Sequence, residues 1–285
     1  MIGSRRPAAR VGAEQNPEAS QVLPGAWRLG AARGAVEVKA VYRDKMAVAF
    51  IFGLPSILLV LLGSIFGSQA AARGVTVGQL FTAGMIAGGI MSTSFQYLAI
   101  GIATERENGM LKRLAGTPMP GAAYFAGKVV QVMVCTVAET VLLIAVGMVF
   151  YHLHLPASPG RWWTFAWVFG LGVAACSLLG IAASSLPRSA ASAVPVITLP
   201  FTVLQFISGV YVPFNDVPAW MRDVASFFPL KWMAQGMRSV FLPQQAAALE
   251  PARAWEHGRT ALVLAIWLAA GLVLCAKTFR WQSRR

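Results

Sequence analysis

The most regular feature of this sequence is a series of long stretches without charged residues. No Asp, Glu, Lys or Arg occurs in 46–72, 74–104, 140–160, 162–187, 189–215 or 260–276. A bilayer core needs roughly 20 apolar residues per helix, and none of the stretches alternates as barrel strands do. Backbone groups in lipid must pair internally, so each stretch is expected to be helical. The pattern predicts six spans: 46–66, 80–103, 124–150, 162–186, 192–211 and 260–276.

The third span contains two charged residues. Lys128 lies near its start, where a long side chain is expected to snorkel to the lipid headgroups. Glu139 lies in its middle, where a charge costs on the order of 3 kcal/mol on insertion scales. This glutamate is therefore expected to face the bundle interior, to pair with a donor or to stay protonated. Two interpretations are open: a functional role in a cavity or in proton linkage, and a structural hydrogen bond to a neighbouring helix.

Composition agrees with a membrane protein. Of the 285 residues, 56% are hydrophobic and only 12% are charged, yet the formal net charge is +13. Soluble domains have about 25% charged residues, and disordered chains have low hydrophobicity, so both classes are excluded. A basic nucleic-acid-binding protein would cluster its cations beside aromatic residues on a polar surface. Here the cations lie between apolar stretches, which indicates a bilayer and not nucleic acid as the partner.

The positions of the cations predict the orientation of the chain. Six spans place both termini on one side, and 17 of the 24 Lys and Arg residues fall on that side: before the first span, in 104–128, at Arg188 and after the sixth span. The positive-inside rule assigns this side to the cytoplasm. The chain is therefore expected to cross a cell membrane several times, with both termini cytoplasmic.

The residues before the first span divide into two segments. Residues 1–24 are rich in Pro, Ala, Gly, Arg and Gln and are predicted to be a disordered cytoplasmic head. The apolar run that begins at 46 is too long for the core of a cleavable signal peptide. The pair Arg5-Arg6 could belong to a twin-arginine signal, but no apolar segment follows it closely. Residues 25–45 have a charged stripe opposite an apolar one, which favours an amphipathic helix in the interface over an extension of span 1. Residues 46–280 would form the membrane domain and 281–285 a cytoplasmic tail.

The sequence lacks the motifs that an enzyme or an ATPase needs. The run 121–129 approaches the phosphate-binding pattern G-x-x-x-x-G-K-[ST], but it has one residue too many between the glycines and Val129 in place of the hydroxyl. The three histidines lie at or beyond the outer ends of spans, and the three cysteines lie within spans at no metal-binding spacing. We therefore expect no catalytic residue, no metal site and no cofactor bound by this chain.

The inner loop after the second span is dense in charges of both signs. Thr104 followed by Glu107 fits a capping box, which predicts a short helix over 104–114 that ends before Pro118. Such a helix suits docking onto another protein, whereas an ordinary charged loop is the alternative. The candidate docking residues are Glu105, Arg106, Glu107, Gly109, Leu111, Lys112, Arg113 and Leu114.

Residues 212–259 lie outside yet are far from hydrophilic. Pro218 can start a helix, with Asp216 and Val217 as possible caps, and 230–242 offers a second helix. Irregular backbone at membrane depth must be covered by protein or water. We therefore expect a re-entrant or surface-lying helical pair packed between the fifth and sixth spans.

Three segments together resemble the permease subunits of type-2 ABC exporters, which include bacterial drug, lipid and polysaccharide export permeases. They are the interfacial helix, the loop 105–114 (Glu-Arg-Glu-Asn-Gly-Met-Leu-Lys-Arg-Leu), and 206–213 leading to 228–232. The resemblance covers roughly 27–280. It implies that the interfacial helix and the loop contact a separate ABC ATPase subunit, which would hold ATP and magnesium. It also implies pairing with a second copy or a paralogous permease.

Irregular positions within spans 1, 2 and 5 suggest where movement would occur. Pro55, Pro195 and Pro200 permit kinks, and Gly84 with Gly88 permits close approach of a neighbouring helix. Aromatic and amide side chains at depth suit an amphipathic cargo, although they would equally serve helix packing. The candidate path residues are Phe95, Gln96, Tyr97, Glu139, Phe201, Gln205 and Phe206.

The sequence thus predicts an all-α membrane protein that exports a hydrophobic or amphipathic substrate with a separate ATPase. A drug or antibiotic is the leading cargo, and a lipid or polysaccharide is the second. The alternatives are a stand-alone secondary carrier or channel, which would call for inverted repeats or several intramembrane charges, and an intramembrane enzyme.

Overall fold

The chain folds as a helical bundle in the computed structural model, which describes residues 26–72, 74–117 and 121–278. The predicted head at 1–24, the tail at 281–285 and Pro118 lie outside these residues. Within them, six segments are long and apolar enough to cross a membrane: Lys45–Phe66, Val77–Glu107, Gly121–Tyr151, Pro159–Ala183, Ala190–Ile207 and His257–Thr278. The prediction of an all-α protein with six spans is confirmed, with boundaries shifted by a few residues.

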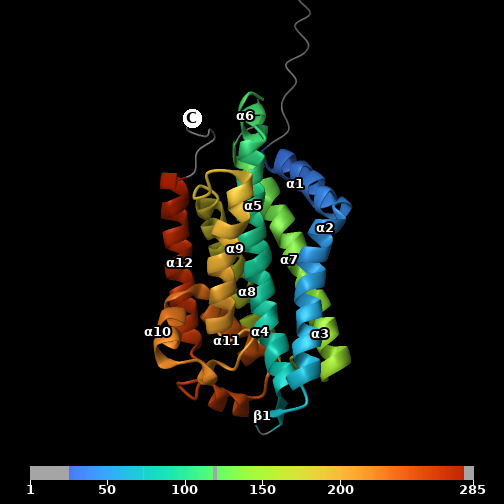
Figure 1. Ribbon diagram of the computed structural model, residues 1–285, viewed down its shortest axis with the longest axis vertical. Helices are drawn as coiled ribbons and strands as arrows, with labels where there is room; N and C mark the ends of the chain where they lie inside the picture. The colour runs from blue at the N-terminus through green and yellow to red at the C-terminus, as the bar shows by residue number, and fades with distance from the viewer. Residues whose placement is uncertain (1–25, 73, 118–120, 279–285) are drawn as a thin grey trace, which may run out of the picture.

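The bundle has two ends, which Figure 1 shows at the top and the bottom. The interfacial helix α1 (Ala26–Arg43) and the short α6 (Met110–Ala115) lie at one end, and the last turns of α12 (His257–Thr278) point the same way. At the other end lie α10 (Ala219–Phe227), α11 (Pro229–Phe241) and a hairpin of β1 (Ala70–Ala72) and β2 (Val75–Thr76). We call these the α6 end and the α11 end.

Spans 1 and 2 each contain a π-helical segment. Span 1 consists of α2 (Lys45–Val48), η1 (Ala49–Gly53) and α3 (Leu54–Phe66), and span 2 consists of α4 (Val77–Met91), η2 (Ser92–Tyr97) and α5 (Leu98–Glu107). The ring of Pro55 would collide with the carbonyl of Ile51, which lies in η1, so the wider turn relieves that clash. In η2 the Ser94 hydroxyl donates to the Ile90 carbonyl, a bond that tends to bend helices. The two π-helical segments contact each other.

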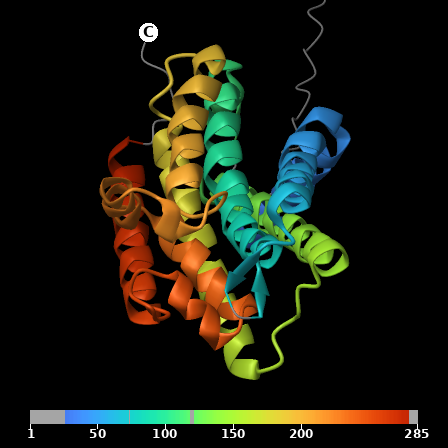
Figure 2. The same ribbon diagram turned by 60° about the horizontal axis from the view of Figure 1, so that its bottom comes forward.

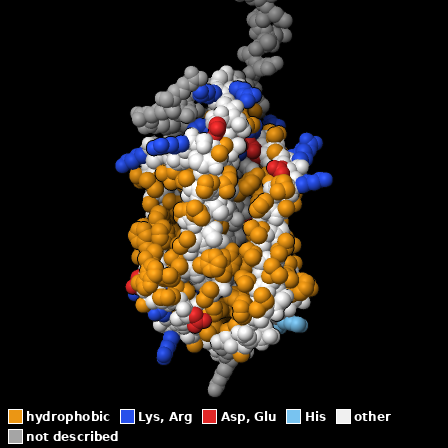
Figure 3. Space-filling view, in the orientation of Figure 1, with side chains coloured by type: hydrophobic (Ala, Val, Ile, Leu, Met, Phe, Trp, Pro, Cys, Tyr) orange, Lys and Arg blue, Asp and Glu red, His pale blue; other side chains and the backbone are white. Residues whose placement is uncertain are grey.

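The remaining spans are continuous helices. Span 3 is α7 (Gly121–Tyr151), span 4 is α8 (Pro159–Ala183), and span 5 is α9 (Ala190–Ile207), which contains Pro195 and Pro200. Figure 3 shows an apolar belt around the visible face, with Lys and Arg side chains at both ends and more of them at the α6 end. This distribution is the one that a bilayer around the middle of the bundle requires.

The helical pair after span 5 follows the re-entrant alternative of the prediction. It comes between spans 5 and 6 in the chain, where α11 lies against α4, α8 and α12 and α10 contacts α9. Every residue of α11 is buried, so α11 is part of the core and not a surface helix. The residue at the N-cap of α10 is Pro218, and neither Asp216 nor Val217 caps it. Figure 2 brings this end forward, where β1 of the hairpin contacts η4 (Gln244–Leu249), the segment that follows α11.

The interfacial helix packs directly on span 3. A Cβ atom added to Gly34 of α1 would lie 2.5 Å from the Val130 Cβ of α7, so only glycine permits this close approach. Asp44 ends α1 and caps α2, because its carboxylate accepts bonds from the amides of Met46 and Ala47 at 3.0 and 3.2 Å. The described part of the predicted segment 25–45 thus contains a helix, α1, with a break at Asp44, while its place in a membrane interface stays a prediction.

Candidate functional site

The candidate cargo site is a groove of about 460 Å³ between spans 1, 2 and 5. Its walls are mainly apolar and include the side chains of the kinked regions in all three spans. The lining residues used below are Phe50, Ser92, Gln96, Phe201, Gln205 and Phe206. Phe50 belongs to η1, and Ser92 and Gln96 belong to η2, so both π-helical segments face this groove. Such segments are frequent at functional sites.

Two amide side chains are among the polar residues that line the groove. Gln96 Nε2 donates to Thr198 Oγ1 at 2.9 Å, and Gln205 Oε1 accepts from the Tyr211 hydroxyl at 2.7 Å. A Cβ added at Gly88 would lie 3.0 Å from Gln205 Nε2. The predicted glycine pair therefore brings span 2 against the end of span 5.

The seven predicted path residues lie in different places. Four of them, Gln96, Phe201, Gln205 and Phe206, line the groove. Phe95 lines a second, apolar cavity of about 510 Å³ that is bordered by spans 2, 4, 5 and 6 and shares Phe201 with the groove. Tyr97 lines a polar cavity beside α1, and Glu139 lines none of these three. The predicted set is therefore divided among several cavities, and its role as a substrate path stays a prediction.

Glu139 is held between spans 2 and 3. The Thr93 hydroxyl donates to Glu139 Oε2 at 2.5 Å, and a Cβ added at Gly89 would lie 2.6 Å from Glu139 Oε1. The residue is 1% exposed. This geometry favours the structural interpretation, a hydrogen bond that joins two helices, over a role in lining the groove.

The predicted docking helix begins later than expected. Thr104 does not cap a helix: its hydroxyl donates to the Ile100 carbonyl at 2.9 Å, and α5 continues through it to Glu107. The break falls at Gly109, whose φ of 70° is readily available only to glycine. The capping-box prediction is therefore wrong, because the motif lies inside a helix whose hydrogen bonds are already complete.

A buried charged cluster joins α5 to α1 and α7. Lys128 Nζ lies 2.5 Å from Glu105 Oε1 and 3.1 Å from Glu37 Oε2, and Glu37 also pairs with Arg33 at 2.5 Å. Tyr124 donates to Glu105 at 2.8 Å. Lys128 is only 4% exposed, so the prediction that it snorkels to the headgroups is wrong. We call Arg33, Glu37, Glu105 and Lys128 the Lys128 cluster.

The other predicted docking residues fall into two groups. Arg106 donates to the Ser184 carbonyl at 2.7 Å, and Glu107 accepts from the Ala190 amide, so both hold α5 against the ends of spans 4 and 5. Leu111 is fully buried, whereas Lys112 and Arg113 are exposed on α6. Gly109 and Leu114 are half-buried. Thus the exposed charge of α6 comes from two cations.

Sequence reasoning missed the role of Glu37 and Lys128. The i, i+4 spacing of Arg33 and Glu37 predicts a pair on one helix face, within the charged stripe of α1. Nothing in the spacing of Lys128 indicates that it reaches this stripe, because the contact depends on how α1 crosses α7.

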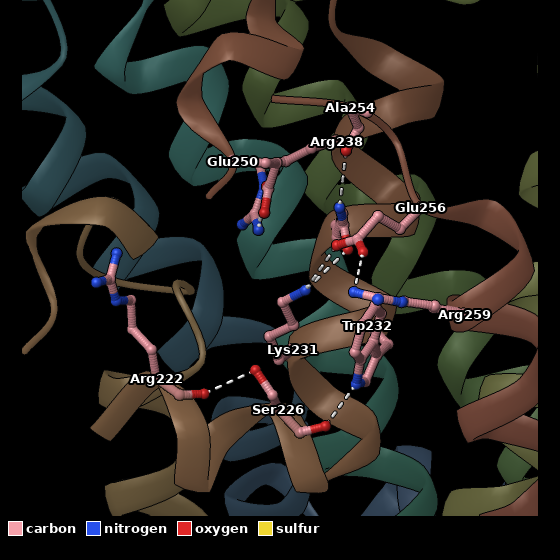
Figure 4. A network of polar contacts seen from close by, with 10 residues as sticks. Arg222, Ser226, Lys231, Trp232, Arg238, Glu250, Ala254, Glu256 and Arg259 are labelled. Carbon is pink, nitrogen blue, oxygen red and sulfur yellow. Dashed lines mark hydrogen bonds and ion pairs between the residues drawn. The ribbon is translucent and has the colours of Figure 1, made fainter. Parts of the chain in front are cut away.

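A second polar network lies at the α11 end (Figure 4). Arg238 of α11 bonds through Nε to Glu250 Oε1 at 2.7 Å and through Nη1 to the Gly209 carbonyl at 3.0 Å. Lys231 contacts Gln235 at 2.9 Å and lies 3.9 Å from Glu256. Through Glu250 and Glu256 the segment after α11 is held against one face of α11. Through the Gly209 carbonyl, α11 is held against the end of span 5.

Lys231 gives this network an expected pH dependence. Burial lowers the pKa of Lys231 to about 8, opposed by Glu250 and Glu256 and assisted by Arg238 and Arg259. The window lies between the pKa of Lys231 in the folded protein, about 8, and its ordinary value of 10.5. There Lys231 is protonated in the unfolded chain and neutral in the folded one, so the free energy of unfolding rises with pH.

The matched variant for this effect is Lys231→Met, which has no proton to lose at this position. Relative to Lys231→Met, the wild type should gain about 2 kcal/mol of unfolding free energy between about pH 7 and about pH 9.5. Unfolding of both proteins in detergent at the two pH values measures the change. A stability gap that stays constant with pH would contradict it.

Comparison with known proteins identifies the family. Residues 34–242 match the family described as ABC-2 type transporter. A probable doxorubicin resistance ABC transporter permease protein, DrrC of Mycobacterium tuberculosis, is 23% identical over 244 residues, which cover 85% of this chain and 83% of the relative. The putative transport permease ycf38 of Porphyra purpurea is 26% identical over 193 residues, 66% of this chain and 65% of the relative.

A further relative matches over a shorter region. The probable multidrug ABC transporter permease YbhR of Escherichia coli K12 is 23% identical over 144 residues, or 50% of this chain. The match spans 38% of the length of that relative. The family match covers well over half of the chain, including spans 1 to 5 and the helical pair at the α11 end. The chain belongs to the ABC-2 type transporter family of permeases.

Proposed function

We propose that the chain is the membrane-spanning subunit of an exporter that is driven by a separate ABC ATPase subunit. The observation that carries this proposal is the groove between spans 1, 2 and 5, which is walled by both π-helical segments and by the proline-containing span 5. A groove built from irregular helices can change its width when the helices tilt. Its mainly apolar wall with the amides of Gln96 and Gln205 suits a hydrophobic or amphipathic cargo.

The names of the relatives bear on the cargo. One is named for doxorubicin resistance and one as a multidrug permease, which supports a drug or antibiotic as the first cargo to test, and a lipid or polysaccharide as the second. The groove volume of about 460 Å³ is of the size that drug-sized ligands occupy.

The ATPase is proposed to dock at the α6 end, which places this end and both termini in the cytoplasm of a bacterial cell. There α6 exposes Lys112 and Arg113, while Glu105, Arg106 and Glu107 connect its base to spans 3, 4 and 5. A push on α6 would therefore be transmitted to three spans at once. ATP and magnesium would be bound by the ATPase, and a second copy or a paralogous permease would complete the exporter.

The docking proposal predicts a specific loss. The double variant Lys112→Glu/Arg113→Glu should lower co-purification with the cognate ABC ATPase and ATP-driven export in vesicles by about tenfold or more. The ATPase surface that complements the two wild-type cations would be acidic, and it would repel the two introduced carboxylates. Both residues are exposed, so the thermal midpoint of the permease alone should stay unchanged.

The matched control reverses two cations at the opposite end, Arg222→Glu/Arg253→Glu, and should leave ATPase binding intact. Normal ATPase binding and export by the Lys112/Arg113 variant would refute the docking assignment. Export that continues without any ATPase would instead favour a secondary carrier.

A further inference from the structure

A second, polar cavity of about 190 Å³ lies among α1, span 2 and α7 at the α6 end. Its lining includes three carboxylates, those of Glu37, Asp44 and Glu105, and one ammonium group, that of Lys128. Glu37 and Glu105 are already paired within the Lys128 cluster. Asp44 has no cation partner among the residues that the structure describes, and only its Oδ1 is used, as the cap of α2. The lining therefore retains an unneutralised negative charge.

A buried amide in the same cavity also lacks a partner. Gln131 of α7 lines the cavity and is 6% exposed. In the described part of the chain its side-chain amide makes no hydrogen bond, and its polar atoms are not sealed within the protein. The hydroxyl of Tyr97, which also lines the cavity, has no hydrogen-bond partner in those residues either. Both groups are therefore free to bond to a molecule that enters the cavity.

The chemistry of the lining selects the class of ligand. A net negative lining disfavours an anion and favours a cation. The carboxylate of Asp44, the amide oxygen of Gln131 and the hydroxyl of Tyr97 offer three acceptors, which is the number of donors on a primary ammonium group. The described residues contain no group of three His, Cys, Asp or Glu that could hold a metal ion, so an organic cation fits better.

Size and position narrow the ligand further. At roughly 30 Å³ per water molecule, the cavity holds a small headgroup but not a whole drug. Asp44 is exposed where α1 ends and span 1 begins, so the cavity opens at the level of an interfacial helix. Consecutive residues of η2 face two sites, because Gln96 lines the groove and Tyr97 lines this cavity.

We propose that this cavity binds the primary ammonium group of an amphipathic molecule at the α6 end of the bundle. The ammonium group belongs either to a lipid headgroup or to an amine on the cargo. The cargo source rests on the proposed export function, whereas binding of the ammonium group does not. The experiment therefore uses the full-length permease alone, in detergent and without any ATPase.

The probe is octylammonium, compared with octyltrimethylammonium, which has the same tail but no N–H donor. Isothermal titration should show octylammonium binding more tightly. Asp44→Asn, which keeps a capping oxygen for α2, and Gln131→Leu should each lower its affinity by about tenfold to a hundredfold, the range for hydrogen bonds to charged groups. Asp223→Asn on α10, an exposed acid at the opposite end, is the control and should bind like the wild type.

The two sources are separated with lipid. If phosphatidylethanolamine, but not phosphatidylcholine, competes with octylammonium and is retained by the wild type more than by Asp44→Asn, the ligand is a lipid headgroup. If octylammonium binds and neither lipid competes, the ligand is an amine on the cargo. Equal affinity for both octyl probes, or unchanged affinity in both variants, would overturn the proposal and leave a cavity that holds water only. Failure of export with every ATPase tested would refute the proposed export function but would not bear on the binding of an ammonium group in this cavity.

Discussion

Replacing Lys128 with methionine should destabilise the permease more than any other single change at the α6 end. Lys128 is the only partner of Glu105 among the cations of the described chain, and it shares Glu37 with Arg33. Removing it leaves carboxylates buried without full compensation, which costs about 3–5 kcal/mol. The thermal midpoint in detergent should fall, and ATP-driven export should be lost with it, because α5 loses its attachment to α1 and α7.

A neutral replacement of the three residues around Lys128 separates charge from packing. The triple variant Glu37→Gln/Glu105→Gln/Lys128→Met removes the stranded carboxylates, and the amide oxygen of Gln at 37 can still accept from Arg33, so it should recover most of the lost stability. Lys112→Met on α6 is the matched control: that lysine is exposed, so its replacement should change the free energy of unfolding by no more than about 0.5 kcal/mol. A Lys128→Met midpoint equal to that of Lys112→Met would show that the cluster does not stabilise the fold.

Arg238→Met should produce the corresponding loss at the α11 end. The Arg238 and Glu250 side chains are 2% and 1% exposed, and Arg238 also donates to the Gly209 carbonyl. The variant leaves a buried carboxylate and a carbonyl without their donor, at a cost of about 3–5 kcal/mol. Thermal unfolding and faster amide hydrogen exchange over 244–256, the segment that Arg238 fastens, are the two measurements.

The control for Arg238 is another arginine from the same network. Arg259 pairs with Glu256 at 2.6 Å, but its side chain is 72% exposed, and exposed pairs contribute about 0–1 kcal/mol. Arg259→Met should therefore have little effect, and Arg238→Met/Glu250→Leu should be more stable than Arg238→Met alone. If the double variant were less stable than the single one, the buried pair would not be the cause of the loss.

The spans could be predicted from sequence because a bilayer imposes its requirement on each segment separately. A stretch of roughly 20 residues either avoids charge or does not, and no knowledge of its neighbours is needed. The positions of α1 and of the helical pair followed from equally local signals, an amphipathic stripe and Pro218. The break at Gly109 also has a local signal, because glycine commonly interrupts a helix. The capping pattern of Thr104 and Glu107 instead predicts a helix that starts five residues too early.

What could not be predicted depends on contacts between distant segments. From the hydropathy pattern, Lys128 is a lysine at the end of a span and is expected to reach the lipid headgroups. Only the packing of α1 against α7 shows that it pairs with Glu37. The same limit applies to α11: the sequence allows a re-entrant or a surface-lying helix, and only the fold shows that the segment 244–256 supplies partners for Lys231 and Arg238. In the candidate path, residue type selected Phe95, Gln96 and Tyr97 together, but three neighbours on a helix point in different directions.

The π-helical segments have a consequence for the family history of the chain. A π-helical turn holds an extra residue relative to an α-helical one, so η1 and η2 each behave as a one-residue insertion within a span. At 3.6 residues per turn, deleting that residue would rotate everything beyond it by about 100°. Relatives that gap by one residue near 49–53 or 92–97 would then present a different side chain to the groove, which changes cargo preference without any substitution in its wall.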